Sequence, residues 1–125
     1  SRNRGCTIYP SNSLKKDLVM NIMDIGGKVV KDNDTYQLKD NTTLDNLVVS
    51  STRLHPNKST TGHSHPGQEE VYNFVEGSGR IYLDDVPHNV GQGDVVLIKS
   101  GVHHRVVAYE KGLYFVCVFD GKRNH

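Results

Sequence analysis

The chain has 125 residues, with 15 Lys and Arg against 14 Asp and Glu, and its formal net charge at pH 7 is +1. This near balance gives no electrostatic reason to expect nucleic acid or an acidic membrane surface as a partner. The length suits one domain, the apolar fraction of 35% predicts a small core, and no apolar run is long enough to span a membrane.

The two cysteines, Cys6 and Cys117, lie far apart and form no CxxC pattern. We interpret them as free thiols in a reducing compartment, and Cys117 fits the run "LYFVCVF" as a small buried residue. The N-terminal sequence "SRNRGCTIYP" lacks the apolar segment of a signal peptide. We therefore expect a cytoplasmic location.

The N-terminal part shows little β character. In "SLKKDLVMNIMDIGG", Ser13 is a candidate helix N-cap and Gly26 a candidate stop. The apolar residues between them fit either a short helix or an irregular strand; they are Leu14, Leu18, Ile22 and Ile25. We expect residues 1–44 to form an extension, as strands or a short helix, that packs on a barrel of residues 45–125.

From Gly26 onward the chain consists of short β-rich runs separated by turn-forming residues. The runs are "KVV", "TYQL", "LVVSSTRL", "EEVYNFVEG", "GRIYL", "GDVVLI", "HRVVAY" and "LYFVCVF". The turn formers between them include Asp32-Asn33-Asp34, Asp40-Asn41, Pro56-Asn57, Pro66-Gly67, Gly77-Ser78-Gly79, Asp84-Asp85, Gly91-Gln92-Gly93 and Lys111-Gly112. This spacing is typical of an all-β sandwich or barrel, and the absence of helical runs argues against a parallel α/β sheet.

One stretch, "GHSHPGQEEVYNFVEG", combines histidine with carboxylate. His63 and His65 differ by two positions, so on a strand both side chains point to the same face. Pro66-Gly67 should turn the chain, so that Glu70 begins a new strand with its direction set afresh. Two imidazoles and a carboxylate can then converge from neighbouring strands, as a first-row divalent metal requires.

Two aromatic residues follow on the same predicted strand. Tyr72 and Phe74 share the face of Glu70, because side chains two positions apart point the same way. We therefore expect both rings on the inner face.

A second stretch, "GDVVLIKSGVHHRV", supplies two further histidines. It reads as a strand, a turn at Ser100-Gly101, and a strand entered by His103 and His104. Adjacent side chains on a strand point to opposite faces, so at most one of these two faces the interior.

Together the two stretches resemble the paired motifs of the cupins, small β-barrels of the jelly-roll type. The first cupin motif is a Gly, five residues, HxH, three or four residues, Glu, six residues and Gly; it is matched by His63, His65, Glu70 and Gly77, with Asn57 at the leading Gly. The second is a Gly, five residues, PxG, two residues, His, three residues and Asn; it is matched by Gly93, Gly101 and His104, with Lys99 at the Pro and Ala108 at the Asn. The resemblance covers roughly residues 45–120 and implies a single-domain cupin jelly-roll barrel with an N-terminal extension.

The resemblance also implies a metal site. Its ligands would be His63, His65, Glu70 and His104, holding one divalent transition metal: Zn, Fe, Mn, Ni or Co. His103 would then point out of the barrel or into a dimer contact.

A more local likeness suggests a reaction. "TTGHSH" followed by "EEVYNFVEGSG" is similar to the cupin-type phosphoglucose isomerases. This implies an isomerase or epimerase for a sugar or sugar phosphate, in which a base shuttles a proton beside the metal. Tyr72 is the candidate base, against the alternative that it is a packed core residue. The candidates for gripping a phosphate are Arg53, Lys58 and Lys99.

Two other functions stay open. An Fe(II)-dependent dioxygenase or lyase would use the same ligands, with a less polar pocket lined by Tyr72, Phe74, Val95, Leu97 and Val106. A non-catalytic cupin would only bind a small acid.

For every function we expect a small-molecule ligand and neither nucleic acid nor a membrane as partner. We also expect a homodimer, with residues 1–40 adding a strand or covering an edge. The remaining histidines, His55, His88 and His125, are expected to be exposed or locally bonded, with His55 nearest the site.

Overall fold

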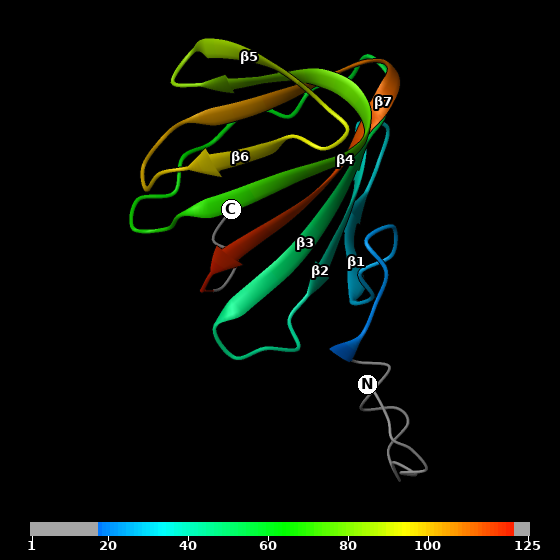
Figure 1. Ribbon diagram of the computed structural model, residues 1–125, viewed down its shortest axis with the longest axis vertical. Coiled ribbons are helices and arrows are strands. Elements are labelled where there is room, and N and C mark those ends of the chain that lie inside the picture. The colour runs from blue at the N-terminus through cyan, green and yellow to red at the C-terminus, as the bar shows by residue number, and fades with distance from the viewer. Residues whose placement is uncertain (1–17, 122–125) are drawn as a thin grey trace, which may run out of the picture.

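The computed structural model describes residues 18–121, and within them every regular element of more than one residue is a β-strand. The strands are β1 (Lys28–Asp32), β2 (Tyr36–Asn41), β3 (Leu47–Leu54), β4 (Glu70–Leu83), β5 (Val86–Gly91), β6 (Val95–Ile98) and β7 (His104–Asp120). Figure 1 shows that they form one curved, rolled sheet. The predicted all-β fold class is confirmed. No helix in the described range is long and apolar enough to cross a membrane.

The strands pair antiparallel in the order β1-β2-β3-β7-β4-β5, and β6 pairs with the first part of β4. The centre of the sheet is the ribbon of β4 and β7, which pair along most of their length from Glu70↔Phe119 to Leu83↔His104. Short strands then pair on either side of this ribbon, so that the sheet curls around a single interior (Figure 1).

The ribbon bends where the sequence suggested turns. Gly77-Ser78-Gly79 and Lys111-Gly112 do not separate strands, as expected above, but lie within β4 and β7. The pairing register shifts between Gly77 and Gly79, which marks a bulge, and bulges bend a strand pair. Gly77 has a φ of +85°, and a Cβ atom there would collide with the carbonyl oxygen of Gly112. The glycines therefore allow a close, bent strand pairing rather than chain reversals.

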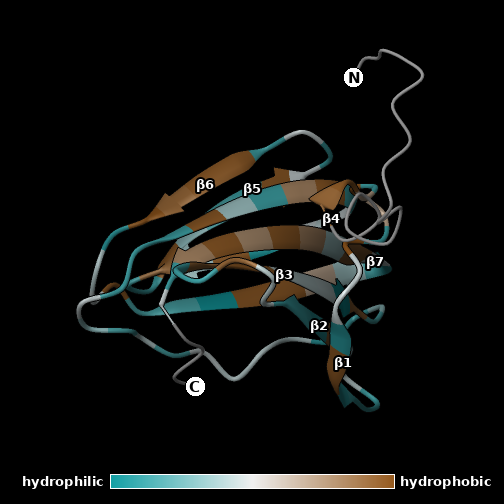
Figure 2. Ribbon diagram, turned by 90° about the horizontal axis from the view of Figure 1, so that it is seen from below, coloured by the Kyte–Doolittle hydropathy of each residue, from teal (hydrophilic) through white to brown (hydrophobic). Residues whose placement is uncertain are grey.

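The inner face of the roll carries the core. Along β4 the burial alternates, with Glu70, Tyr72 and Phe74 buried and the residues between them partly exposed, as predicted. The main cluster consists of Leu54, Tyr72, Phe74, Ile81, Val90, Ile98, Val106, Ala108, Leu113, Phe115 and Cys117. Figure 2 shows hydrophobic bands along the central strands that carry this cluster.

The described part of the segment before β1 packs on the outside of the sheet, and it is not helical between residues 19 and 27, where a short helix was one of two expectations. Asn21 and Asp24 accept hydrogen bonds at their side chains from backbone N–H groups two residues on, at 2.8 and 3.0 Å. Such local bonds compete with the helical pattern, and the two residues face each other in an isolated β-bridge instead. The proposed cap Ser13 and Leu14 lie outside the described residues.

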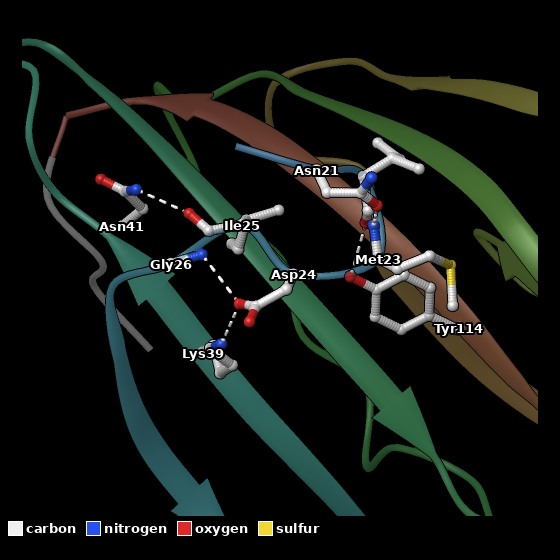
Figure 3. A network of polar contacts seen from close by, with 9 residues as sticks. Asn21, Met23, Asp24, Ile25, Gly26, Lys39, Asn41 and Tyr114 are labelled. Carbon is white, nitrogen blue, oxygen red and sulfur yellow. Dashed lines mark hydrogen bonds and ion pairs between the residues drawn. The ribbon is translucent and has the colours of Figure 1, made fainter. Parts of the chain in front are cut away.

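Three contacts hold this segment to the sheet, as Figure 3 shows. The Asn41 side chain donates a 2.7 Å hydrogen bond to the Ile25 carbonyl, and Lys39 pairs with Asp24 at 2.6 Å. The Tyr114 hydroxyl donates to the Ile22 carbonyl at 2.8 Å. The Lys39 ammonium lowers the pKa of the Asp24 carboxyl by hydrogen bonding to it. The division at residue 44 stays a prediction, and β1 and β2 continue the same sheet as β3.

Candidate metal centre

His63 is positioned by backbone pairing with the start of β7. The His63 N–H donates to the His104 carbonyl at 3.1 Å, and the His104 N–H donates back at 2.9 Å. Residues that exchange both bonds face each other directly, with side chains on one side, and here the two ring centroids are 4.6 Å apart. The predicted strand around the HxH stretch is instead a loop with isolated bridges at Ser59 and His63.

The predicted turn at Pro66-Gly67 is present. The Gln68 N–H donates to the His65 carbonyl at 3.0 Å, and the Gly67 N–H donates to the Ser100 hydroxyl oxygen at 2.7 Å. The second bond ties this turn to the loop that precedes His104. The chain then enters β4 at Glu70, whose carboxylate faces the interior.

Four side chains from these elements converge on one point. Nε2 of His104 lies 3.2 Å from Oε1 of Glu70, and Nε2 of His65 lies 3.6 Å from the same oxygen. One ligand atom from each of His63, His65, Glu70 and His104 lies within 4.8 Å of the others. His63 is half-buried and the other three are buried. The structure thus brings the four predicted residues together, and His63, Glu70 and His104 also line a cavity.

The hydrogen bond of His104 Nδ1 leaves its Nε2 available to bind a metal. Its Nδ1 lies 3.0 Å from the carbonyl oxygen of Val102, which only accepts, so Nδ1 carries the proton. In the neutral form of the ring, the Nε2 lone pair faces the Glu70 carboxylate, and two acceptors 3.2 Å apart need either a proton or a metal ion between them. A proton satisfies one such pair, whereas a divalent cation satisfies all four groups. An outer hydrogen bond that fixes the ring in this way is characteristic of metal-binding histidines.

His103 lies outside the group, as the alternation along β7 predicts. It is exposed, while its neighbour His104 is only 2% exposed. His55 places Nε2 3.1 Å from the Asn33 carbonyl oxygen, and His88 is exposed on β5, so both are local or surface residues. His125 lies outside the described residues.

Beside the four ligands is a cavity of about 290 Å³. Its walls combine ligands, hydroxyl groups and apolar core residues: Lys31, Tyr36, Leu38, Ser50, Thr52, Thr60, Thr61, Gly62, His63, Glu70, Tyr72, His104, Val106, Phe115, Cys117 and Phe119. The sequence placed Tyr72 and Val106 correctly in this wall. Hydroxyl groups and apolar side chains therefore share the wall of the cavity.

The expected wall residues Val95 and Leu97 are wrong. They are 60% and 71% exposed, and they lie on β6 at the edge of the sheet (Figure 2). β6 pairs Val96 with Tyr72 and Ile98 with Glu70, and directly opposed residues share a face. Val96 and Ile98 therefore face inward, and Val95 and Leu97 face solvent.

The three basic residues suggested for a phosphate do not line this cavity. Arg53 lies 4.4 Å above the Tyr114 ring and 3.3 Å from the Glu76 carboxylate, while Lys58 and Lys99 are exposed elsewhere. Among the described residues, the lysine or arginine that lines the cavity is Lys31 on β1, which sequence reasoning missed.

Comparison with known proteins gives the family. The family profile for the cupin domain matches residues 50–119, more than half of the chain. Oxalate decarboxylase OxdC of Bacillus subtilis is 33% identical over 84 residues, which are 61% of this chain and 21% of that enzyme. Protein SchB of Streptomyces halstedii is 36% identical over 52 residues, 42% of this chain and 38% of SchB. The chain therefore matches well under half of either relative.

Solved structures share the fold at low identity. KdgF from Halomonas sp. superposes with a TM-score of 0.69 at 18% identity, covering 78% of this chain and 88% of KdgF. A predicted oxalate decarboxylase of Thermotoga maritima gives 0.68 at 18% identity, covering 82% and 97%. The polyketide cyclase RemF of Streptomyces resistomycificus gives 0.70 at 22% identity, covering 86% and 81%. With its paired motifs, its rolled antiparallel sheet and the match over residues 50–119, this chain belongs to the cupin family.

Proposed function

We propose that the chain binds one divalent transition metal through His63, His65, Glu70 and His104. The observation that carries the proposal is the convergence of three imidazoles and one carboxylate in a buried group. Three nitrogen donors and one oxygen donor suit Zn, Fe, Mn, Ni or Co, and the cellular supply selects among them.

We further propose an enzyme that isomerises or epimerises a small polar metabolite, such as a sugar or sugar phosphate. When bound, the metal polarises substrate oxygens and acidifies the C–H bond between them. The Thr52 and Thr60 hydroxyl groups would orient the substrate in the cavity by hydrogen bonding. The Thr60 oxygen already accepts from the Val106 N–H, which leaves its proton for the substrate, whereas the Ser50 hydroxyl proton goes to the Lys39 carbonyl. A cavity of about 290 Å³ limits the substrate to a small molecule.

Tyr72 is our candidate for moving the proton at its phenolic oxygen. Its ring stacks on Phe115 at 5.2 Å between centroids, with an interplanar angle of 16°, and meets His104 edge to face at 5.7 Å. These contacts fix the ring between the core and the ligand group. A residue held in this way keeps one geometry relative to the bound substrate, as proton transfer requires.

The reaction class is tested on the metal-loaded protein with a panel of aldoses, ketoses and their phosphates. Isomerisation or epimerisation is redox-neutral, so it should proceed without O₂ and with several divalent metals. Solvent deuterium should enter the product at the carbon that loses its proton. Turnover that stops under nitrogen would favour the dioxygenase instead.

A second candidate is a lyase that decarboxylates a small carboxylic acid, and the match to oxalate decarboxylase favours it. In this reaction the bond to the carboxylate carbon breaks, CO₂ leaves, and a proton adds to the carbon that remains. We propose Tyr72 as the donor of that proton. Release of CO₂ from oxalate or from a 2-oxo acid, in place of isomerised sugar, would favour this function.

We also propose the ligand type, the location and the partners of the protein. We expect a small-molecule ligand, a cytoplasmic location, and a homodimer without nucleic acid or a membrane as partner. The exposed apolar side chains of Val95 and Leu97 on the edge strand β6 support a second copy as partner. Gel filtration with light scattering gives the mass in solution, and a monomer at all concentrations contradicts the dimer. A non-catalytic cupin would be stabilised by its ligand but turn over none of the compounds tested.

A further inference from the structure

β1 contains an irregularity that changes the direction of one side chain. It pairs with β2 through Val29↔Lys39, and the next pair along the strand is Lys31↔Leu38. Val30 is therefore an extra residue in β1, a β-bulge. Beyond a bulge, every side chain faces the side opposite to the one that strict alternation predicts.

The side chain redirected in this way is Lys31. It stands opposite Leu38, which is buried and lines the cavity, and opposed residues share a face. Lys31 consequently lines the same cavity, although it comes from a strand that is exposed along its whole length. In a regular pairing Val30 would take this position, and Lys31 would point to the outer face.

The charges that line the cavity indicate what Lys31 could bind. Within residues 18–121, Lys31 and Glu70 are the charged residues, other than histidine, that line it. Glu70 is one of the four candidate ligands, so its charge faces the metal. With a divalent ion bound, the cavity carries a net positive charge, and Lys31 is a second positive group outside the ligand set.

We propose that Lys31 binds an anionic group of the substrate, a carboxylate or a phosphate, on a part of the molecule that the metal does not hold. This inference rests on the proposed metal site and narrows its substrates to small metabolites with a metal-chelating end and a second, anionic end. An ammonium group that donates hydrogen bonds to an anion forms a strong contact, which adds both affinity and discrimination against neutral analogues.

The test compares three probes by calorimetric titration of the metal-loaded protein. Lactate offers a 2-hydroxy acid for chelation, malate adds a distal carboxylate, and 3-phosphoglycerate adds a distal phosphate. We expect malate or 3-phosphoglycerate to bind about tenfold more tightly than lactate. The stronger of the two identifies which anion the site takes. The advantage should shrink near 1 M salt, where the screening length is about 3 Å.

Variants assign the advantage to Lys31. Lys31→Met should remove most of it, because the affinity for malate or 3-phosphoglycerate should fall far more than the affinity for lactate, and metal content should stay the same. Lys31→Arg should keep most of it. Lys58→Met is the matched control, because Lys58 is an exposed lysine outside the cavity wall, and it should keep the advantage. Deletion of Val30 removes the bulge and should abolish the advantage although Lys31 remains.

The two proposals fail in different ways. If the protein binds metal but prefers neither malate nor 3-phosphoglycerate over lactate, or if Lys31→Met keeps the preference, the role of Lys31 is wrong and the metal site stands. If the protein binds no metal, the proposed function fails first, and the inference about Lys31 falls with it.

Discussion

His104 and Glu70 lie 3.2 Å apart, although they begin opposite ends of the central ribbon. Glu70 pairs with Phe119 at one end of this ribbon, and His104 pairs with Leu83 at the other. The two ends meet because β4 and β7 bend together at the bulged glycines. The bend that closes the barrel therefore also assembles the candidate metal centre.

Replacing a glycine at the bend should harm both stability and metal binding. In Gly77→Ala the added Cβ collides with the carbonyl of Gly112 at a φ of +85°. We expect a loss of more than about 2 kcal/mol in the free energy of unfolding, from urea denaturation. Gly67→Ala is the control, since φ is +82° there but nothing lies within 4 Å of the new Cβ. It should cost about 1 kcal/mol, and equal losses would mean that close strand approach at Gly77 does not matter.

The register of the two adjacent histidines can be tested directly. His104→Ala removes a buried ligand, whereas His103→Ala changes an exposed residue. We expect metal affinity to fall more than about a hundredfold in the first variant and less than about threefold in the second. Competition with a chromophoric chelator measures both. Equal effects would contradict the placement of His104 as the ligand.

Tyr72→Phe should separate chemistry from metal binding. It removes the phenolic oxygen and keeps the ring stacked on Phe115. If Tyr72 moves the proton, kcat on the converted substrate should fall about 10²–10⁴-fold while metal content stays the same. Tyr36→Phe, at another tyrosine of the cavity wall, is the matched control and should fall much less. An unchanged kcat in Tyr72→Phe would assign Tyr72 to packing.

One of the three contacts that hold the segment before β1 to the sheet is made by a buried amide. Asn41→Ala removes the 2.7 Å bond to the Ile25 carbonyl and should cost about 1–3 kcal/mol of unfolding free energy. Asn89→Ala removes an exposed bond from the Tyr109 hydroxyl and should cost less than about 0.5 kcal/mol. Urea denaturation compares the two. Since both variants leave the ligands in place, metal content should not change.

Much of the site could be predicted from the sequence, because the patterns that mark it lie between residues close together in the chain. The spacing of His63, His65 and Glu70 around a Pro-Gly turn carries the motif, and alternation alone limits the inner-facing residue to one of His103 and His104. The fold class followed from short apolar runs between turn formers. These features depend on neighbouring residues and on a period of two.

What the sequence did not reveal depends on pairing between distant strands. Lys31 reaches the cavity because a bulge reverses the alternation of β1, and "KVVKD" carries no sign of an extra residue. In "VVLI" all four residues are apolar, so only pairing with β4 shows that Val95 and Leu97 face solvent. Gly77 and Gly112 read as turns because a glycine that allows close strand approach has the same sequence signature as one that reverses the chain.

Elemental analysis of protein purified without chelators shows whether the four side chains bind one metal ion. We expect about one equivalent of a divalent transition metal per chain in the wild type. We expect almost none in a His63→Ala/His104→Ala double variant that keeps its β-sheet circular dichroism. A wild-type protein without metal that also fails to take up any added divalent ion, or a double variant that retains a full equivalent, would contradict the proposed metal site.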